Sequence, residues 1–149
     1  MDNSGQQVIP KKKSKKKWIA IGIVIVIVII IAAVVLSPKT KTITLVTSGT
    51  VINVPAGHYI EQGFSFKVSG TISGSISATS GITFYLMSPS QYSSMQANGT
   101  FSEYTYTTGD ISSGSINTNI GSGTWYVVFY NSNIITPTTV TVNSLTFTN

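Results

Sequence analysis

The chain has 149 residues, a formal net charge of +5 at pH 7 and no cysteine, and this length suits one modest domain with an appended segment. The lack of cysteine excludes disulfides, thiolate metal sites and a cysteine nucleophile. The charge is unevenly distributed: from Thr42 onward one lysine and three carboxylates give a net charge of −2, so a basic N-terminal segment is joined to a nearly neutral body.

A lysine cluster and a long apolar run occupy the N-terminal part of the chain. The cluster consists of Lys11, Lys12, Lys13, Lys15, Lys16 and Lys17. The nineteen residues 18–36 that follow carry no charge, and as a helix they would span about 30 Å, the thickness of a hydrocarbon core. The run is longer than the apolar region of a cleaved signal peptide, and Trp18 places an indole ring at the level of the headgroups. We therefore expect a single, uncleaved N-terminal transmembrane α-helix.

The charges that flank this helix predict its orientation. The lysine-rich side of a membrane helix stays in the cytoplasm, and only Lys39 and Lys41 follow the apolar run directly. We thus expect four parts, which are a cytoplasmic tail over 1–17, the transmembrane helix over 18–36, a stalk over 37–42 and an extracellular domain over 43–149. The lysine cluster and Trp18 would contact the lipid bilayer, where a lysine near an anionic surface contributes about 1 kcal/mol. A short tail without base-reading elements predicts no specific nucleic-acid partner.

Beyond the stalk, apolar residues alternate with a period of two, which is typical of half-buried strands. Three runs share one core-facing pattern: Phe64, Phe66 and Val68, then Ile82, Phe84 and Leu86, then Trp125, Val127 and Phe129. Near the C-terminus the alternation skips between Val142 and Leu145, which predicts a bulge at Asn143 or Ser144. The strings TISGSIS and ISSGSIN, near residues 71 and 111, echo each other. Because turn residues recur at short intervals, we expect an all-β domain, an antiparallel β-sandwich of seven to nine strands.

One stretch, SPSQYSSMQANG, departs from the period of two. Ser88, Pro89 and Gln91 have the spacing of a capping box with proline at the first helical position. Tyr92 and Met95 then fall on one helical face, and the Asn-Gly pair at 98–99 ends the pattern. We expect one short helix of about two turns in a crossover between strands.

The late strands resemble those of GOLD (Golgi-dynamics) domains. In that family a glycine-led, aromatic-rich strand ends in a Phe-x-Asn turn before a final strand, and Gly123, Tyr126, Phe129 and Asn131 match this pattern. The segment FSFKV is similar to an earlier Phe-x-Phe strand of the family, whereas Tyr130 stands where an aspartate is usual. The resemblance covers about half of the body. It implies an extracytoplasmic or lumenal β-sandwich that makes protein or lipid contacts and is not catalytic.

The titratable residues give little support for catalysis. His58 is the only histidine, so a site with two histidine ligands is excluded, and the carboxylates are too sparse for a calcium loop. A triad of His58, Asp110 and a serine has no spacing in its favour. Glu61 and Glu103 could form the carboxylate pair of a glycosidase, but solvated charges at strand ends explain them as well. We expect no enzyme activity, no cofactor and no metal.

Two kinds of surface site remain. Tyr85, Tyr126 and Tyr130 fall on the strand faces opposite the core, where they could contact a neighbouring subunit or a glycan. Asn98 begins the sequence Asn-Gly-Thr, which is an acceptor for N-glycosylation in an exported domain.

The leading interpretation is a membrane-anchored β-sandwich with a structural, adhesive or partner-binding role at the surface of a cell or virion. Its partners would be other surface or envelope proteins, or further copies of the chain. The alternative is an archaeal type IV pilin-like filament subunit, which would be cut after the basic stretch, although the bulky Trp18 disfavours that cut. A surface ectoenzyme is the least favoured reading. The arginine-free body with few titratable groups indicates an acidic or harsh exterior, as in some archaea.

Overall fold

The structure, a computed structural model, describes residues 40–149. The predicted cytoplasmic tail, the predicted transmembrane helix and the first half of the predicted stalk lie outside the described residues, and so do the lysine cluster and Trp18. Among residues 40–149, no helix is long and apolar enough to cross a membrane.

The described part of the chain is all-β apart from one helix. Its elements are β1 (Thr42–Val46), β2 (Thr50–Val54), β3 (Tyr59–Phe66), β4 (Gly70–Met87), α1 (Pro89–Asn98), β5 (Tyr106–Ile120), β6 (Gly123–Tyr130) and β7 (Thr138–Thr148). The seven strands and the single helix agree with the predicted antiparallel sandwich. β1 begins at the last residue of the predicted stalk.

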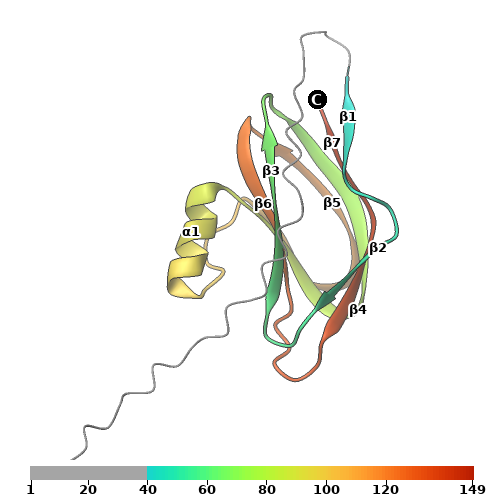
Figure 1. Ribbon diagram of the computed structural model, residues 1–149, viewed down its shortest axis with the longest axis vertical. Helices are drawn as coiled ribbons and strands as arrows, with labels where there is room; N and C mark the ends of the chain where they lie inside the picture. The colour runs from blue at the N-terminus through green and yellow to red at the C-terminus, as the bar shows by residue number, and fades with distance from the viewer. Residues whose placement is uncertain (1–39) are drawn as a thin grey trace, which may run out of the picture.

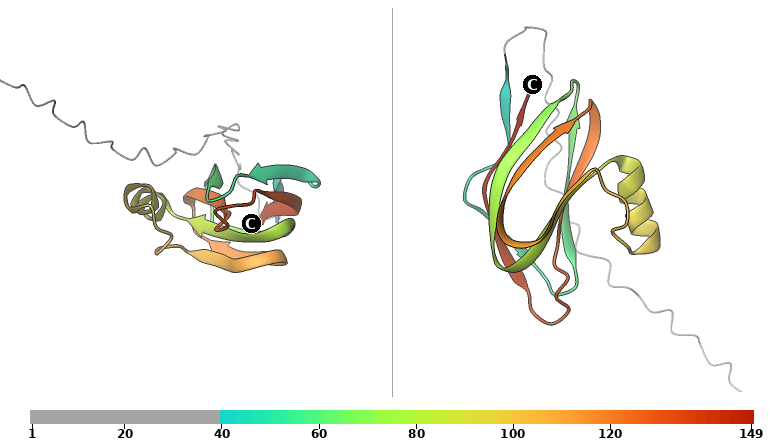
Figure 2. Two further views of the ribbon diagram at one scale, coloured as in Figure 1. Left: turned by 90° about the horizontal axis from the view of Figure 1, so that it is seen from below. Right: turned by 180° about the vertical axis from the view of Figure 1, so that it is seen from behind.

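The strands form one antiparallel sheet that folds over on itself. Its order is β1-β7-β4-β6-β3, with β2 added beside β7 and β5 beside β4. The 18-residue strand β4 pairs first with β7, through residues 71–78, and then with β6, through residues 83–87. β4 and β5 curve together around one end of the domain, so that β1, β2 and β7 face β3 and β6 across the core (Figures 1 and 2). The curved β4–β5 pair therefore belongs to both layers of the sandwich.

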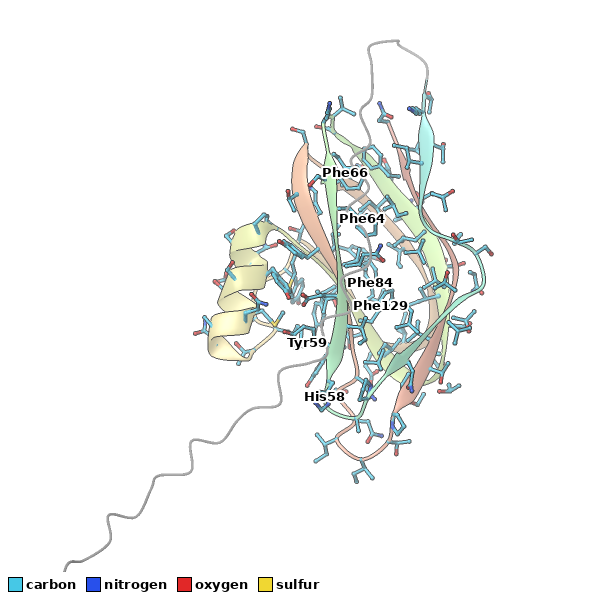
Figure 3. The ribbon with its side chains drawn as sticks, viewed as in Figure 1. His58, Tyr59, Phe64, Phe66, Phe84 and Phe129 are labelled. Carbon is cyan, nitrogen blue, oxygen red and sulfur yellow. The ribbon has the colours of Figure 1, made fainter. Side chains whose placement is uncertain are left out.

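The core fills the space between these layers and uses the faces that the sequence predicts. Its buried residues include Phe64, Phe66, Ile72, Ile76, Ile82, Phe84, Leu86, Val127, Phe129, Val140, Val142, Leu145 and Phe147, and Val68 and Trp125 pack at its edge. Figure 3 shows Phe64, Phe66, Phe84 and Phe129 between the layers. Burial of each such side chain stabilises the fold by about 1.5–3 kcal/mol.

A bulge and two glycines adjust the curved strands to each other. β4 pairs Ser75 with Ser144 and Ile76 with Val142, so Asn143 is the extra residue of the predicted bulge. The two echoing strings pair antiparallel, which sets Gly74 opposite Ile116 and Gly114 opposite Ile76. A Cβ added at Gly74 would lie 2.2 Å from the carbonyl oxygen of Ser144. Gly74 thus leaves room for β7, and Gly114 leaves room for the side chain of Ile111 on its own strand.

The register also defines two opposite ends of the domain. The start of β1 pairs with the end of β7, through Thr42 and Thr148. The turn 55–58 between β2 and β3 and the loop 131–137 between β6 and β7 lie at the other end (Figure 1). We call this second end the distal end, because it lies away from both the first described strand and the C-terminus.

Candidate functional site

Helix α1 forms as its local sequence predicts and lies outside the sandwich, beside β6 and β4 (Figure 1). The Ser88 hydroxyl accepts a hydrogen bond from the Gln91 backbone N–H (3.4 Å), and Gln91 Oε1 accepts one from the Ser88 N–H (2.9 Å). Gly99 ends the helix in the left-handed region at φ 67°, where glycine is favoured. At 10 residues the helix is longer than the expected two turns. Its buried residues, Tyr92 and Met95, are the predicted pair.

The helix covers part of an aromatic sheet face. This face, on the outer side of β3, β6 and β4, carries a second hydrophobic cluster with the buried residues Met87, Tyr92, Met95 and Val128. Tyr59, Tyr85, Phe101 and Tyr126 pack against that cluster and are half-buried. The outer face of these strands is therefore apolar as well. Antiparallel sheets commonly pack one face against the core and expose the other to water, so this second apolar face is an additional feature.

Tyr126 packs against helix α1. Its ring stacks on that of Tyr92, with centroids 4.2 Å apart and planes 10° apart. Gly63 pairs with Tyr126 across the two strands, and a Cβ there would be in ordinary contact with Tyr126 Cε1 at 3.4 Å. Of the three tyrosines predicted for surface contact, Tyr126 is thus the one beneath the helix, on the predicted strand face.

The other two predicted tyrosines meet in a stack built around Phe101. The centroid distance to Phe101 is 4.9 Å for Tyr85 and 4.2 Å for Tyr130, with interplanar angles of 13° and 28°. Tyr104 adds a tilted contact to Tyr85 at 5.3 Å and is 42% exposed. We call Tyr85, Phe101, Tyr104 and Tyr130 the aromatic patch. Phe101 and Tyr104 lie in the loop after α1. Because this loop has no periodic pattern, only their aromatic type could have marked these two residues.

A carboxylate and several phenols give this face its electrostatic character. The Tyr92 hydroxyl donates to Glu61 Oε2, and Gln96 Nε2 donates to the Tyr92 oxygen (2.9 Å). Burial raises the pKa of Glu61. Burial, with the nearby charge of Glu61, raises the pKa of Tyr59, and burial with the neighbouring Tyr104 and Tyr130 raises that of Tyr85. Both phenols offer hydroxyl groups beside apolar rings.

The residues weighed for catalysis do not gather. His58 Nδ1 is 2.7 Å from the Ala56 carbonyl oxygen, within its own turn. Glu61 lies on β3 under α1, whereas Glu103 is exposed in the loop after α1. Within residues 40–149, no three or more His, Cys, Asp or Glu side chains group closely enough to hold a metal ion.

Asn98, the predicted glycan acceptor, is exposed as the last residue of α1. Thr100, the third residue of its sequon, is also exposed. The acceptor therefore lies at a helix end rather than in the loop beyond it, and its side chain is accessible.

Asn131 has a role that sequence reasoning missed. It is fully buried, and its Nδ2 donates to the carbonyl oxygens of Val54 (3.3 Å) and Thr136 (2.9 Å). Its Oδ1 accepts from the Asn133 N–H (3.0 Å), and its own N–H donates to the His58 carbonyl oxygen (2.9 Å). One side chain thereby ties together both loops of the distal end. The only sequence signal was its place in the Phe-x-Asn pattern.

No family model matches the chain, and no curated protein matches it in sequence. Among solved structures, it is similar to the pre-peptidase C-terminal domain of a collagenase from Bacillus anthracis. The identity is 17%, the match covers 64% of this chain and 89% of that one, and the TM-score is 0.43.

Proposed function

We propose that the chain is a single-pass membrane protein that displays its β-sandwich outside the cell or virion and binds another surface or envelope protein there, without catalysis. The observation that carries the binding role is the aromatic patch, in which Phe101 joins Tyr85 and Tyr130 on an outer sheet face. Tyrosine is enriched at the centres of protein interfaces, because one ring offers a large apolar area and a polar tip.

The patch is well prepared for binding. The rings of Tyr85, Phe101 and Tyr130 hold one another by stacking, so few side-chain rotamers are left to be lost when a partner binds. Tyr104 is the most exposed ring of the patch, and it would be the first to contact a partner.

Crosslinking in intact membranes tests this role. Tyr104→Ser should weaken association by about 1–2 kcal/mol, or roughly five- to thirtyfold, as loss of an interface anchor does, and crosslinks to neighbouring proteins should fall accordingly. Val51→Ser is the matched control, because Val51 is an exposed apolar residue (63%) on β2, away from the patch. Equal crosslink yields in the two variants would refute the role of the patch.

The membrane anchor and its orientation rest on the lysine cluster and the uncharged run 18–36. Replacing all six lysines of the cluster by glutamine should randomise or invert the orientation, since lysine bias sets topology. Protease protection of the N-terminal tail in sealed membranes measures this. Replacement of Lys39 and Lys41 by glutamine is the control and should keep the native orientation. Unchanged protection after loss of the cluster would contradict the assignment.

The N-terminal processing of the chain distinguishes the anchored protein from the pilin-like subunit. An uncleaved anchor predicts an intact mass that includes the lysine cluster, whereas a mature chain beginning near Trp18 would indicate the pilin-like subunit instead.

The GOLD-like pattern at Phe129 and Asn131 supports a domain that makes protein or lipid contacts. The scarcity of titratable groups after Thr42 supports an acidic exterior of the kind some archaea and their viruses meet.

A further inference from the structure

The loop between β6 and β7 exposes two adjacent isoleucines at the distal end. Ile134 and Ile135 are 82% and 84% exposed, more than the other large hydrophobic residues in the described part of the chain. Single exposed apolar residues are ordinary on protein surfaces, but two branched side chains at one loop tip form a local apolar surface. We call this pair the isoleucine tip.

Part of the backbone around the isoleucine tip has hydrogen-bond partners within the protein. Asn133 Oδ1 accepts from the N–H groups of Ile135 (2.9 Å) and Thr136 (3.0 Å). The Thr136 carbonyl oxygen accepts from buried Asn131, and that of Asn133 accepts from the Gly57 N–H (2.7 Å). Unpaired backbone groups prevent a segment from entering hydrocarbon, because each costs several kcal/mol there. The side chains of Asn131 and Asn133 supply partners for part of the loop backbone and fix its shape.

The two segments that form the distal turn and loop, 50–60 and 130–140, contain no Lys, Arg, Asp or Glu, and they include the titratable His58. A charged group near the tip would have to be desolvated as the tip entered an apolar phase. Here the neighbours are alcohols, amides and prolines, among them Ser132, Thr136 and Pro137, which are suited to the headgroup level.

We propose that the isoleucine tip inserts into the surface of a lipid bilayer. The segments around the tip carry no Lys, Arg, Asp or Glu with which to form the charge pairs that orient a specific protein partner. A bilayer needs no such pairs and accepts a small convex apolar tip of any shape. This inference is independent of the aromatic patch, which lies on a sheet face rather than in the distal loops.

The position of the tip determines which bilayer it reaches. It lies at the end opposite the start of β1 (Figures 1 and 3), and the predicted membrane helix precedes that start in the chain. On the proposed anchorage, the tip therefore points away from the membrane that holds the protein. We expect it to enter an apposed bilayer, as in contact between two membranes.

Site-specific fluorescence tests the insertion in the full chain. Because the chain has no cysteine, Ile135→Cys provides a unique site for an environment-sensitive dye, and Val51→Cys provides the matched control at another exposed apolar position. Each labelled protein is reconstituted into phosphatidylcholine vesicles and mixed with protein-free phosphatidylcholine vesicles. Brominated phosphatidylcholine, a contact quencher, is placed in one vesicle population at a time.

The dye at position 135 should lose most of its fluorescence when the quencher is in the protein-free vesicles, and the dye at position 51 should lose little. Addition of Ile134→Ser should reduce the quenching at 135, which shows that the native side chain and not the dye drives insertion. Quenching only from the host vesicles would retain insertion but place the tip in its own membrane. A dye at 135 that neither population quenches, or one quenched no more than the dye at 51, would overturn the proposal. Crosslinking through the aromatic patch would be unaffected by either result.

Discussion

Asn131 is a buried polar side chain on which the geometry of the distal end depends. Its amide nitrogen donates hydrogen bonds to the carbonyl oxygens of Val54 and Thr136, and its amide oxygen accepts one from the Asn133 N–H. Replacement by alanine leaves these groups without partners, and each buried unsatisfied group costs about 1–3 kcal/mol. We expect Asn131→Ala to lower the free energy of unfolding by about 2–4 kcal/mol, as measured by equilibrium denaturation in urea.

Two further variants at asparagine positions separate hydrogen bonding from size. Asn53→Ala, at an exposed position of β2, should change stability by less than about 0.5 kcal/mol. Asn131→Asp keeps the shape but places a carboxylate against carbonyl oxygens, so at neutral pH it should destabilise at least as much as alanine and recover partly in acid. Similar losses at positions 53 and 131 would show that Asn131 does not hold the distal loops.

At the scale of elements, α1 depends on its N-terminal cap. Ser88 accepts from the Gln91 N–H, and loss of such a cap costs about 1 kcal/mol. Ser88→Ala should therefore speed hydrogen exchange of the α1 amides roughly fivefold, if opening of the helix reflects that energy. Ser93→Ala, on the exposed side of the same helix, makes the same replacement without removing a cap and should leave exchange unchanged. Equal exchange in both variants would contradict the importance of the cap.

The pairing of β4 with β7 depends on a close approach at Gly74. A Cβ there would meet the carbonyl of Ser144 at 2.2 Å and Leu145 at 3.1 Å, and such overpacking costs about 1–3 kcal/mol. We expect Gly74→Ala to lower the free energy of unfolding by that amount, measured by urea denaturation. Gly121→Ala is the control, because a Cβ there meets nothing within 4 Å, and it should change stability by less than about 1 kcal/mol. A neutral Gly74→Ala would refute the close approach.

Some helices and strands can be predicted from the sequence better than others. Elements set by interactions between residues close in the sequence are predicted well, and elements set by contacts between distant segments are not. The cap of α1 and the faces of β3 and β6 follow from local chemistry and a period of two, and both predictions are confirmed. The length of β4 was not predicted, because its first half buries only Ile72 and Ile76. Gly74, between them on the same face, removes the apolar residue that would have completed the alternation.

The candidate site was predictable only in part for the same reason. The period of two places Tyr85, Tyr126 and Tyr130 opposite the core, and the structure finds them on that face. The period of two could not show that α1 covers Tyr126, or that the following loop brings Phe101 between Tyr85 and Tyr130. Those contacts join segments far apart in the sequence, and no local propensity encodes them.

At the scale of the whole molecule, the body has few groups through which acid could unfold it. Its carboxylates after Thr42 are Glu61, Glu103 and Asp110. Acid unfolding arises mainly when carboxylates that are charged and stabilised in the native state become protonated. Glu61 acts in the opposite direction, since burial raises its pKa above the ordinary value of 4.5. The folded protein therefore binds a proton at Glu61 more readily than the unfolded chain does.

This difference fixes the sign of the pH dependence. The contribution of a group with a raised folded pKa is fully present below its unfolded pKa and is lost as the pH rises through its folded pKa. We expect the melting temperature of the full chain, followed by circular dichroism, to rise as the pH falls from neutrality toward the ordinary glutamate value of 4.5. Glu61→Gln should abolish the rise, because glutamine can still accept from Tyr92 but does not titrate, whereas Glu103→Gln at an exposed position should preserve it. A melting temperature that falls steeply over this range, or a rise that persists in Glu61→Gln, would show that burial of Glu61 does not govern the response, and would remove the physical support for an acid-adapted exterior.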